Sequence, residues 1–210
     1  DTRYPKLPGH IKNPSAFPFP VLYENVPGAT MARVLDEPEA LLDGFITAAK
    51  NLEAEGVRAI TGSCGFLARY HLELARAVKI PVFASSLLLI PMVYTMLGRQ
   101  GRIGIMTANS KALTPDLLQA VGADGIPVAV EGMQDRGEFR EVVLEGKQRS
   151  LDFALMENEI RSAAKALQHN NPDIRAVVLE CTDISPMAHV VQADLGLPVF
   201  DLISLMTMVH

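Results

Sequence analysis

The amino-acid sequence predicts an α/β fold of two pseudo-twofold-related halves, each a parallel sheet with helices on both faces, and an active-site cleft between them. Three observations support this prediction. Short apolar strands alternate with helical segments along the chain, which is typical of parallel sheets. Residues 57–85 align without a gap on residues 174–202, so the chain contains an internal repeat. The only two cysteines, Cys64 and Cys181, occupy the same point of that repeat.

The first half is expected over residues 1–95, with residues 198–210 returning to it. Residues 1–38 hold seven of the fourteen prolines, which predicts an extended loop with a short strand at 21–23. Apolar residues at helical spacing then predict a helix over 36–54. The remaining segments are expected to be a strand at 57–61, a helix at 66–78, a strand at 81–84 and a helix at 87–97.

The second half is expected over residues 96–197. It begins with a strand at 102–106, followed by a helix at 114–121, for which Thr114 is the expected N-cap. A strand at 126–130, a polar loop at 131–137, a helix at 151–168 and a strand at 174–179 complete the half.

By the symmetry of the two halves, the counterpart of the 102–106 strand should precede Asp1. Asp1 and Thr2 are therefore expected in the loop after such a strand. Ligands of open α/β sheets bind at the carboxyl ends of strands. Asp1, Cys64, Thr107 and Cys181 should consequently face one cleft.

Composition narrows the function classes. The net charge of −5 and the absence of a basic stripe with aromatic residues argue against nucleic acid as a partner. The longest apolar run, 87–93, is too short to span a bilayer, so no membrane partner is expected. No signal-peptide pattern is evident, and a cytoplasmic location is expected. The five histidines lack metal-ligand spacing and no glycine-rich phosphate motif occurs, so we expect neither a metal nor a cofactor.

The two cysteines admit two structural interpretations. A buried thiol behaves as a small apolar side chain, and a pair can form a disulfide. However, both thiols follow a strand and precede a helix, and reactive thiols lie at helix N-termini. Their equivalent positions therefore favour a functional role.

The segments around these thiols resemble the paired motifs of the aspartate/glutamate racemase superfamily. They read Ile60-Thr61-Gly62-Ser63-Cys64 and Leu179-Glu180-Cys181-Thr182-Asp183. The resemblance implies a cofactor-independent racemase or epimerase, an isomerase, acting on a small carboxylic acid such as aspartate. One cysteine thiolate would remove the proton next to the carboxylate, and the other thiol would return a proton to the opposite face. Helix N-terminal amides would stabilise the thiolate and the substrate carboxylate.

The motifs also depart from the family pattern. The usual Cys-Asn-Thr is Cys64-Gly65-Phe66 here, and the Cys-Thr-His of glutamate racemases is Cys181-Thr182-Asp183. An acid at that last position looks more like aspartate racemases. Glu180 is unusual in an apolar strand and should raise the pKa of the neighbouring thiol. Besides the catalytic Cys64 and Cys181, the candidate substrate-binding residues are Asp1, Thr2, Ser63, Gly65, Phe66, Thr107, Asn109, Ser110, Thr182 and Asp183.

Several of these candidates have alternative roles. Phe66 is also expected as a core aromatic side chain. Asn109 and Ser110 fit a capped turn, and Asp183 fits a helix N-cap ahead of Pro186.

Three other functions remain open on the sequence. Arylmalonate decarboxylases of this superfamily keep only the second thiol, and Cys64 argues against that assignment. Maleate isomerases keep both cysteines and use one as a nucleophile. The third is a non-catalytic protein that binds a small acid; a homo-oligomer is possible for any of them. For proton transfer at one carbon, the sulfurs should lie roughly 6–9 Å apart, with residues 4–20 covering the cleft.

Overall fold

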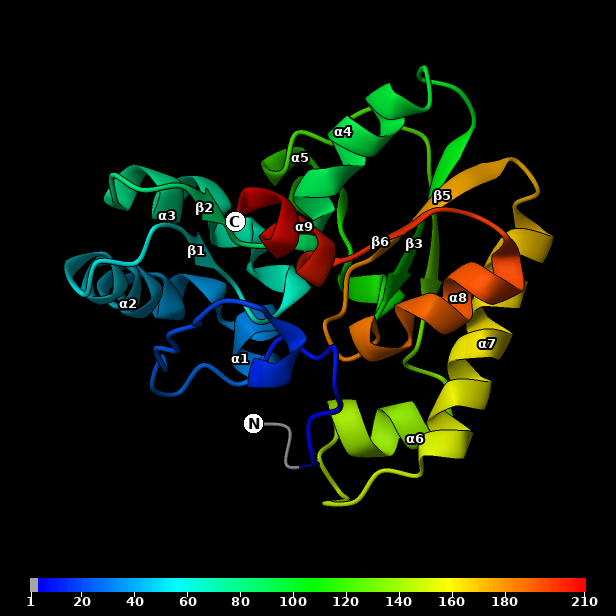
Figure 1. Cartoon of the computed structure of the whole chain (residues 1–210), viewed down its shortest axis with the longest axis horizontal. Coiled ribbons are helices and arrows are strands. Elements are labelled where there is room, and N and C mark those ends of the chain that lie inside the picture. Colours follow the sequence, from blue (N-terminus) through cyan, green and yellow to red (C-terminus); the bar gives the residue numbers. More distant parts are fainter. Residues whose placement is uncertain (1–3) are drawn as a thin grey trace.

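The computed structural model describes residues 4–210 and contains two parallel sheets, each with its own helices. In the first, β1 (Ile60–Thr61) pairs with β2 (Val82–Phe83). The second has the strand order β4-β3-β5-β6, with β3 (Arg102–Thr107), β4 (Val128–Gly132), β5 (Ile174–Leu179) and β6 (Val199–Phe200). Figure 1 shows the β1–β2 unit to the left of the larger sheet. The predicted α/β class is confirmed.

The helices fill the connections between these strands. The α-helices are α1 (Met31–Asp36), α2 (Leu42–Ala54), α3 (His71–Ala77), α4 (Leu89–Met96), α5 (Pro115–Ala120), α6 (Gly137–Phe139), α7 (Phe153–Asn170), α8 (Ala188–Leu195) and α9 (Leu202–Val209). Short 3₁₀ segments are η1 (Pro14–Ala16), η2 (Pro38–Leu41), η3 (Gly65–Tyr70), η4 (Ser86–Leu88), η5 (Ser110–Ala112) and η7 (Ser185–Met187), and η6 (Arg140–Leu144) is a π-helical turn.

The internal repeat folds into the same strand pairing twice. In the first copy Ile60 lies opposite Val82, and in the second Val177 lies opposite Val199. These are equivalent positions of the repeat. The first strand of each copy also donates a backbone hydrogen bond of 2.9 Å to the proline before its partner strand, Pro81 or Pro198. The two cysteines therefore follow strands that occupy equivalent positions of the repeat.

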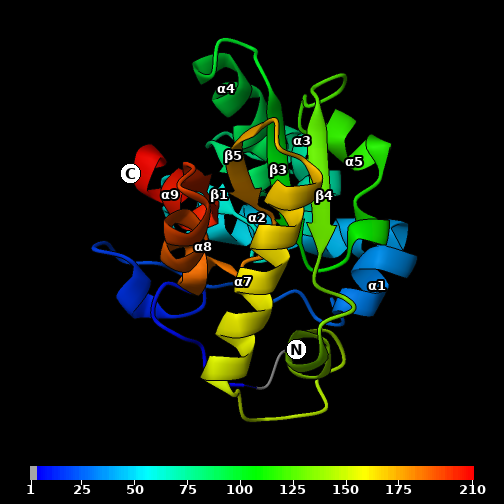
Figure 2. The same ribbon diagram turned by 90° about the vertical axis from the view of Figure 1, so that its right-hand side faces the viewer.

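Helices cover both faces of the larger sheet. Helices α7 and α8 lie on one side and α4 on the other (Figures 1 and 2). The strands at the centre are buried on both faces, which explains why their sequences are continuous apolar runs rather than alternating ones. A side chain at Gly104 of β3 would begin 3.0 Å from Leu167 of α7, so glycine lets this helix approach the sheet closely.

The main departures from the predicted elements lie in the first half. The helix expected over 36–54 is interrupted, because Pro38 lacks an N–H and begins the short segment η2, after which α2 starts at Leu42. Residues 21–23 form no strand, and α1 occupies part of the predicted loop, with the Thr30 side chain accepting a hydrogen bond from the Arg33 N–H. In the second half, α6 and η6 were not predicted.

The end of the chain bridges the two units. Strand β6 pairs with β5 and so belongs to the larger sheet. Helix α9 contributes Leu202 and Met206 to a small apolar cluster with Ile11, Phe17 and Phe83, which joins the N-terminal loop to β2. The predicted domain limits, at 95/96 and 197/198, stay a prediction.

Candidate active site

A cleft of about 1150 Å³ contains both cysteines in its wall. Cys64 follows β1 and is partly exposed, whereas Cys181 follows β5 and is buried. Both are free thiols. Other parts of the wall come from the N-terminal loop, including residues 10–12 and 21–32, and from residues 143–146. The predicted shared cleft is thus present. Of residues 4–20, which were expected to cover it, only 10–12 lie in its wall.

The two thiols have the same local hydrogen bond. The backbone N–H two residues further on, from Phe66 in one loop and Asp183 in the other, donates to the cysteine sulfur and lowers its pKa. Burial has a larger effect than this hydrogen bond on the pKa of each thiol. Burial and the Glu180 charge raise the pKa of Cys64 to about 12, and burial, Asp183 and Glu180 raise that of Cys181 well above its ordinary value. Both thiols are therefore protonated at neutral pH.

Two contacts join the thiol loops to each other. The Thr182 hydroxyl donates a hydrogen bond of 3.0 Å to the backbone carbonyl of Ser63. On the other side, an ideal Cβ at Gly65 would lie 2.2 Å from Oε1 of Glu180 and 2.4 Å from its backbone oxygen. Residue 65 has to be glycine in this arrangement, because any side chain would overlap Glu180. The missing amide of the family's first motif is explained by this contact.

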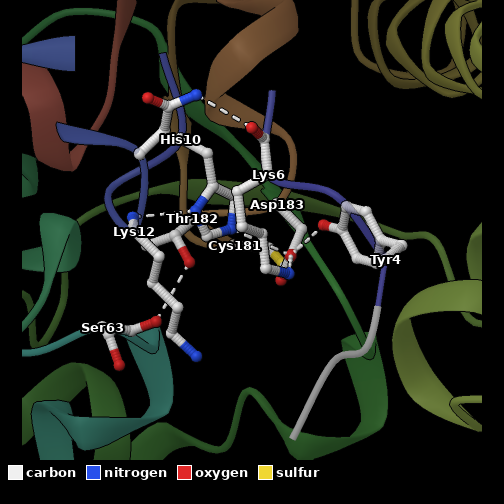
Figure 3. A network of polar contacts seen from close by, with 9 residues as sticks. Tyr4, Lys6, His10, Lys12, Ser63, Cys181, Thr182 and Asp183 are labelled. Carbon is white, nitrogen blue, oxygen red and sulfur yellow. Dashed lines mark hydrogen bonds and ion pairs between the residues drawn. The ribbon is translucent and has the colours of Figure 1, made fainter. Parts of the chain in front are cut away.

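Asp183 is held by the N-terminal loop, as Figure 3 shows. Its Oδ1 accepts hydrogen bonds from the Tyr4 hydroxyl and from His10 Nε2 at 3.0 Å, and forms an ion pair with Lys6 Nζ at 3.3 Å. Its Oδ2 lies 3.7 Å from the Cys181 sulfur. Burial alone would raise the pKa of Asp183, but these partners outweigh it and hold the pKa well below the usual range. Asp183 is consequently an anion that fixes residues 4–10 beside Cys181.

His10 is itself positioned by the N-terminal loop. Its Nδ1 accepts a hydrogen bond of 2.9 Å from the backbone N–H of Lys12, so the ring proton resides on Nε2 and points to Asp183. The Lys12 side chain lines the cleft, and its charge lowers the pKa of Cys64. Sequence reasoning missed Tyr4, Lys6, His10 and Lys12. Their only signal was the expectation that residues 4–20 would cover the cleft.

Glu180 is a buried carboxyl group in the cleft wall. Its Oε2 accepts a hydrogen bond of 2.7 Å from the Thr107 hydroxyl, whereas no partner for Oε1 occurs among residues 4–210. Burial raises the pKa of Glu180 to about 7, although Thr107 and the Ala108 N–H act in the opposite direction. The expected effect of Glu180 on the Cys181 thiol is confirmed in direction.

The structure gathers most of the sequence-predicted site residues at the cleft. The wall contains Ser63, Cys64, Gly65, Phe66, Cys181, Thr182 and Asp183. Phe66 is at the same time fully buried. Asp183 is not the N-cap of η7, which is Ile184; its Oδ1 binds the N-terminal loop, and its Oδ2 lies beside the Cys181 sulfur.

Three predicted residues lie outside the wall of the described cleft. Thr107 binds Glu180 behind it. Asn109 caps η5 by accepting a hydrogen bond from the Lys111 N–H, and Ser110 bonds to Gln134. Asp1 and Thr2 fall outside the described residues. The proposed catalytic and substrate-binding roles of all these residues stay predictions.

The family assignment follows from a family model. The model for Asp/Glu/hydantoin racemases matches residues 20–208. The chain belongs to this family. Among solved structures, a putative Asp/Glu racemase from Yersinia pestis has a TM-score of 0.58 and 16% identity, covering 82% of this chain and 73% of its own. An allantoin racemase from Klebsiella pneumoniae has a TM-score of 0.56 and 20% identity, covering 79% and 63%. These likenesses show the shared racemase fold.

Curated relatives in the racemase family point to another reaction. A dimethylsulfoniopropionate lyase of Durusdinium sp. clade D is 35% identical over 97% of this chain and 69% of its own length. Dimethylsulfoniopropionate lyase 7 of Emiliania huxleyi is 36% identical over 97% of this chain and 62% of its own. This chain thus spans about two thirds of the length of these relatives.

The prediction of a racemase, and therefore of an isomerase, is wrong, because these relatives are lyases. The physical reason is that the resemblance of the thiol motifs implies only a first step, the removal of a proton next to a carboxylate. The later fate of that carbanion depends on the substrate. Of the alternatives that the sequence left open, the relatives favour an enzyme of this family that catalyses a reaction other than racemisation.

Other predicted features remain untested. Among residues 4–210, no helix combines the length and the apolar character needed to cross a bilayer. No group of three or more potential metal-ligating side chains occurs in the same part of the chain. The cytoplasmic location, the absence of a cofactor and the homo-oligomer stay predictions.

Proposed function

We propose that this chain is a lyase that eliminates dimethyl sulfide from dimethylsulfoniopropionate, or from a close sulfonium analogue, without a cofactor. The observation that carries the proposal is the 35% identity to a dimethylsulfoniopropionate lyase over 97% of the chain. The two-thiol cleft supports it, because elimination next to a carboxylate begins with the proton removal for which such thiols are suited.

The chemistry follows from the substrate's structure. A base removes a proton from carbon 2, next to the carboxylate. The electron pair of that C–H bond forms the double bond between carbons 2 and 3, and the bond from carbon 3 to sulfur breaks. Dimethyl sulfide leaves with the electrons of that bond, acrylate remains, and the base is protonated. One base is sufficient, since no proton has to return to the opposite face.

Cys64 is the better candidate for this base. It is the more exposed thiol, and the Lys12 charge favours its thiolate. Burial and the negative charges of Asp183 and Glu180 raise the pKa of Cys181 well above its ordinary value. The same two charges also act on Cys64, but Lys12 opposes them there. The Phe66 N–H that points at the Cys64 sulfur further stabilises the thiolate. Cys181 then shapes the opposite wall of the cleft.

Lys12 is also the candidate partner for the substrate carboxylate. It lines the cleft near Cys64, and a cation at this position would stabilise the negative charge that develops on the carboxylate as the proton leaves. The loop that carries Lys12 is fixed to Asp183 through His10, so the charge is held in place before the substrate binds.

Gas chromatography of dimethyl sulfide tests the proposal. The purified protein, incubated with dimethylsulfoniopropionate, should release dimethyl sulfide and acrylate in equal amounts. The double variant Cys64→Ser/Cys181→Ser is the control and should release neither above the uncatalysed rate. Failure of the wild-type protein to release dimethyl sulfide, under conditions where it is folded, would contradict the function.

A further inference from the structure

The Glu180 carboxyl belongs to the second thiol loop and lies against the backbone of the first, in the wall of the cleft. It precedes Cys181 in sequence, and its Oε1 abuts the backbone of Gly65, next to Cys64. Gly65, Glu180 and Ala108 all line the cleft. Since residue 65 has no side chain, only the glycine backbone separates this oxygen from the space beside Cys64.

Oε1 of Glu180 is buried and has no partner in the described part of the chain. A buried polar atom without a partner is costly, and in native proteins it usually has a functional reason. The neighbouring titratable groups do not provide a cation for this oxygen. Cys64, Cys181 and Asp183 are the titratable groups that act on Glu180 or are acted on by it, and each carries a negative charge when ionised. Within the described part of the chain, the Glu180 carboxyl is acted on by the Thr107 hydroxyl, the Ala108 N–H and the negative Asp183, and none of these is a cation.

We infer that Glu180 receives the positively charged end of the substrate, so that the cleft selects onium carboxylates, whose cation is a sulfonium or a quaternary ammonium group. The inference rests on the proposed function and deepens it by assigning the group that recognises the leaving group. Lys12 and Glu180 then lie at opposite ends of a zwitterion, one for the carboxylate and one for the cation.

The geometry suits a cation without hydrogen-bond donors. A sulfonium or trimethylammonium group carries no N–H or O–H, so its attraction to a carboxylate is Coulombic and acts through a thin wall such as Gly65. At about 6 Å in a partly buried site, this attraction corresponds to roughly a tenfold to hundredfold preference over a neutral group. An ammonium group with N–H donors would lack a direct acceptor at this point.

Two compounds of the same shape test the inference without turnover. 3-(Trimethylammonio)propionate carries the cation, and 4,4-dimethylpentanoate is its neutral isostere. In calorimetric titrations, the wild-type protein should bind the first at least tenfold more tightly. Glu180→Gln, which keeps the acceptor for Thr107, should abolish the preference, and Glu180→Asp should keep part of it. Glu145→Gln is the matched control, because Glu145 also lines the cleft but is exposed at its rim.

Proton release provides a second readout. With its pKa of about 7, Glu180 is mostly protonated just below neutral pH, and a bound cation lowers that pKa. At about pH 6.5 the cationic compound should therefore release a fraction of one proton on binding, detected from the dependence of the binding enthalpy on the buffer. The neutral isostere, and either compound with Glu180→Gln, should not.

The outcomes separate this inference from the proposed function. Equal binding of the two compounds by the wild-type protein, binding of neither at millimolar concentration, or an unchanged preference in a folded Glu180→Gln variant overturns the role of Glu180. Dimethyl sulfide release decides the function independently. If the protein releases dimethyl sulfide but binds both compounds equally, the proposed function stands and the role of Glu180 is refuted. If it prefers the cationic compound but releases no dimethyl sulfide, the proposed function is refuted and the role of Glu180 stands.

Discussion

The hydroxyl of Thr182 donates a hydrogen bond of 3.0 Å to the backbone carbonyl of Ser63, and so links the two thiol loops. The internal repeat relates this contact to that between Gly65 and Glu180, since positions 63 and 180 are equivalent, as are 65 and 182. The duplicated loops therefore touch each other twice, in the same way but with different residues. These contacts set the spacing of the two cysteines.

Removal of the Thr182 hydroxyl should loosen this spacing. We expect Thr182→Val to lower the free energy of unfolding by about 1 kcal/mol, the typical net value of one hydrogen bond. The catalytic rate should fall more than stability alone predicts, because the thiol is displaced from the substrate. Thr182→Ser keeps the hydroxyl and should retain most of the stability and most of the catalytic rate. Urea denaturation and the dimethyl sulfide assay measure the two effects; equal activity of the Val and Ser variants would show that the hydroxyl is dispensable.

The two thiols should differ in their importance. Cys64→Ser removes the proposed base and should reduce kcat by about 10² to 10⁴, the usual contribution of a positioned base. Cys181→Ser should have a smaller effect, because elimination needs one base. For the wild-type protein, kcat/KM should rise with pH from 6 to 9, since burial and the Glu180 charge raise the pKa of Cys64 to about 12. A larger loss with Cys181→Ser would exchange the roles of the two cysteines.

Residue 65 should tolerate no side chain. In Gly65→Ala the new Cβ would lie 2.2 Å from Glu180 Oε1 and 2.4 Å from its backbone oxygen, so the loops must separate. We expect a loss of about 3 kcal/mol in the free energy of unfolding, as for overpacked cores. Truncation of Glu180 should not rescue the variant, because the backbone oxygen remains. Gly137→Ala is the control, since its Cβ would meet its nearest neighbour at 3.5 Å.

The ion pair of Asp183 should make stability depend on acidic pH. The pKa of Asp183 is depressed in the folded protein. Its contribution to the free energy of unfolding is therefore present above about pH 4 and disappears as the pH falls further. Asp183→Asn should cost about 3 kcal/mol near neutral pH, as for a broken buried pair, and less at pH 3. The exposed pair of Arg33 and Glu37 provides the control: Glu37→Gln should cost below about 1 kcal/mol. A cost for Asp183→Asn that does not change with pH would contradict the assignment.

Glu180 should have the opposite pH dependence. Its folded pKa, about 7, is raised above that of the unfolded chain, so the folded state is favoured below pH 4.5 and loses that advantage as the pH rises through 7. Glu180→Gln cannot ionise and should become more stable than the wild-type protein as the pH rises. The difference should approach about 3 kcal/mol near pH 8, from a shift of roughly two pKa units. Thermal unfolding at pH 5 and 8 checks the sign.

Much of the second half could be predicted because its signals are local. The strand expected at 174–179 is β5 in full, and the helix expected at 151–168 differs from α7 by two residues at either end. The N-terminal loop was harder. The interruption at Pro38 follows from one missing N–H. Helix α1 spans only six residues, so its apolar Met31, Val34 and Leu35 are too few to mark a helix within a proline-rich loop.

The reaction, like the N-terminal loop, could not be predicted from local sequence patterns. The paired motifs around Cys64 and Cys181 indicate the family, and this resemblance implies the removal of a proton next to a carboxylate. Racemisation and elimination share that step and diverge at the next carbon. No residue of the motifs reports whether a leaving group is attached there, so the relatives, rather than the motifs, corrected the reaction.

From the sequence alone, the repeat determined the α/β fold, the equivalence of the two cysteines and the expectation of one shared cleft, because these depend on strand order and on short-range apolar patterns. Only the tertiary structure placed Tyr4, Lys6 and His10 on Asp183, and Glu180 against Gly65. These partners lie more than a hundred residues apart along the chain. Their charges interact only after folding removes water from between them, so no local pattern specifies them.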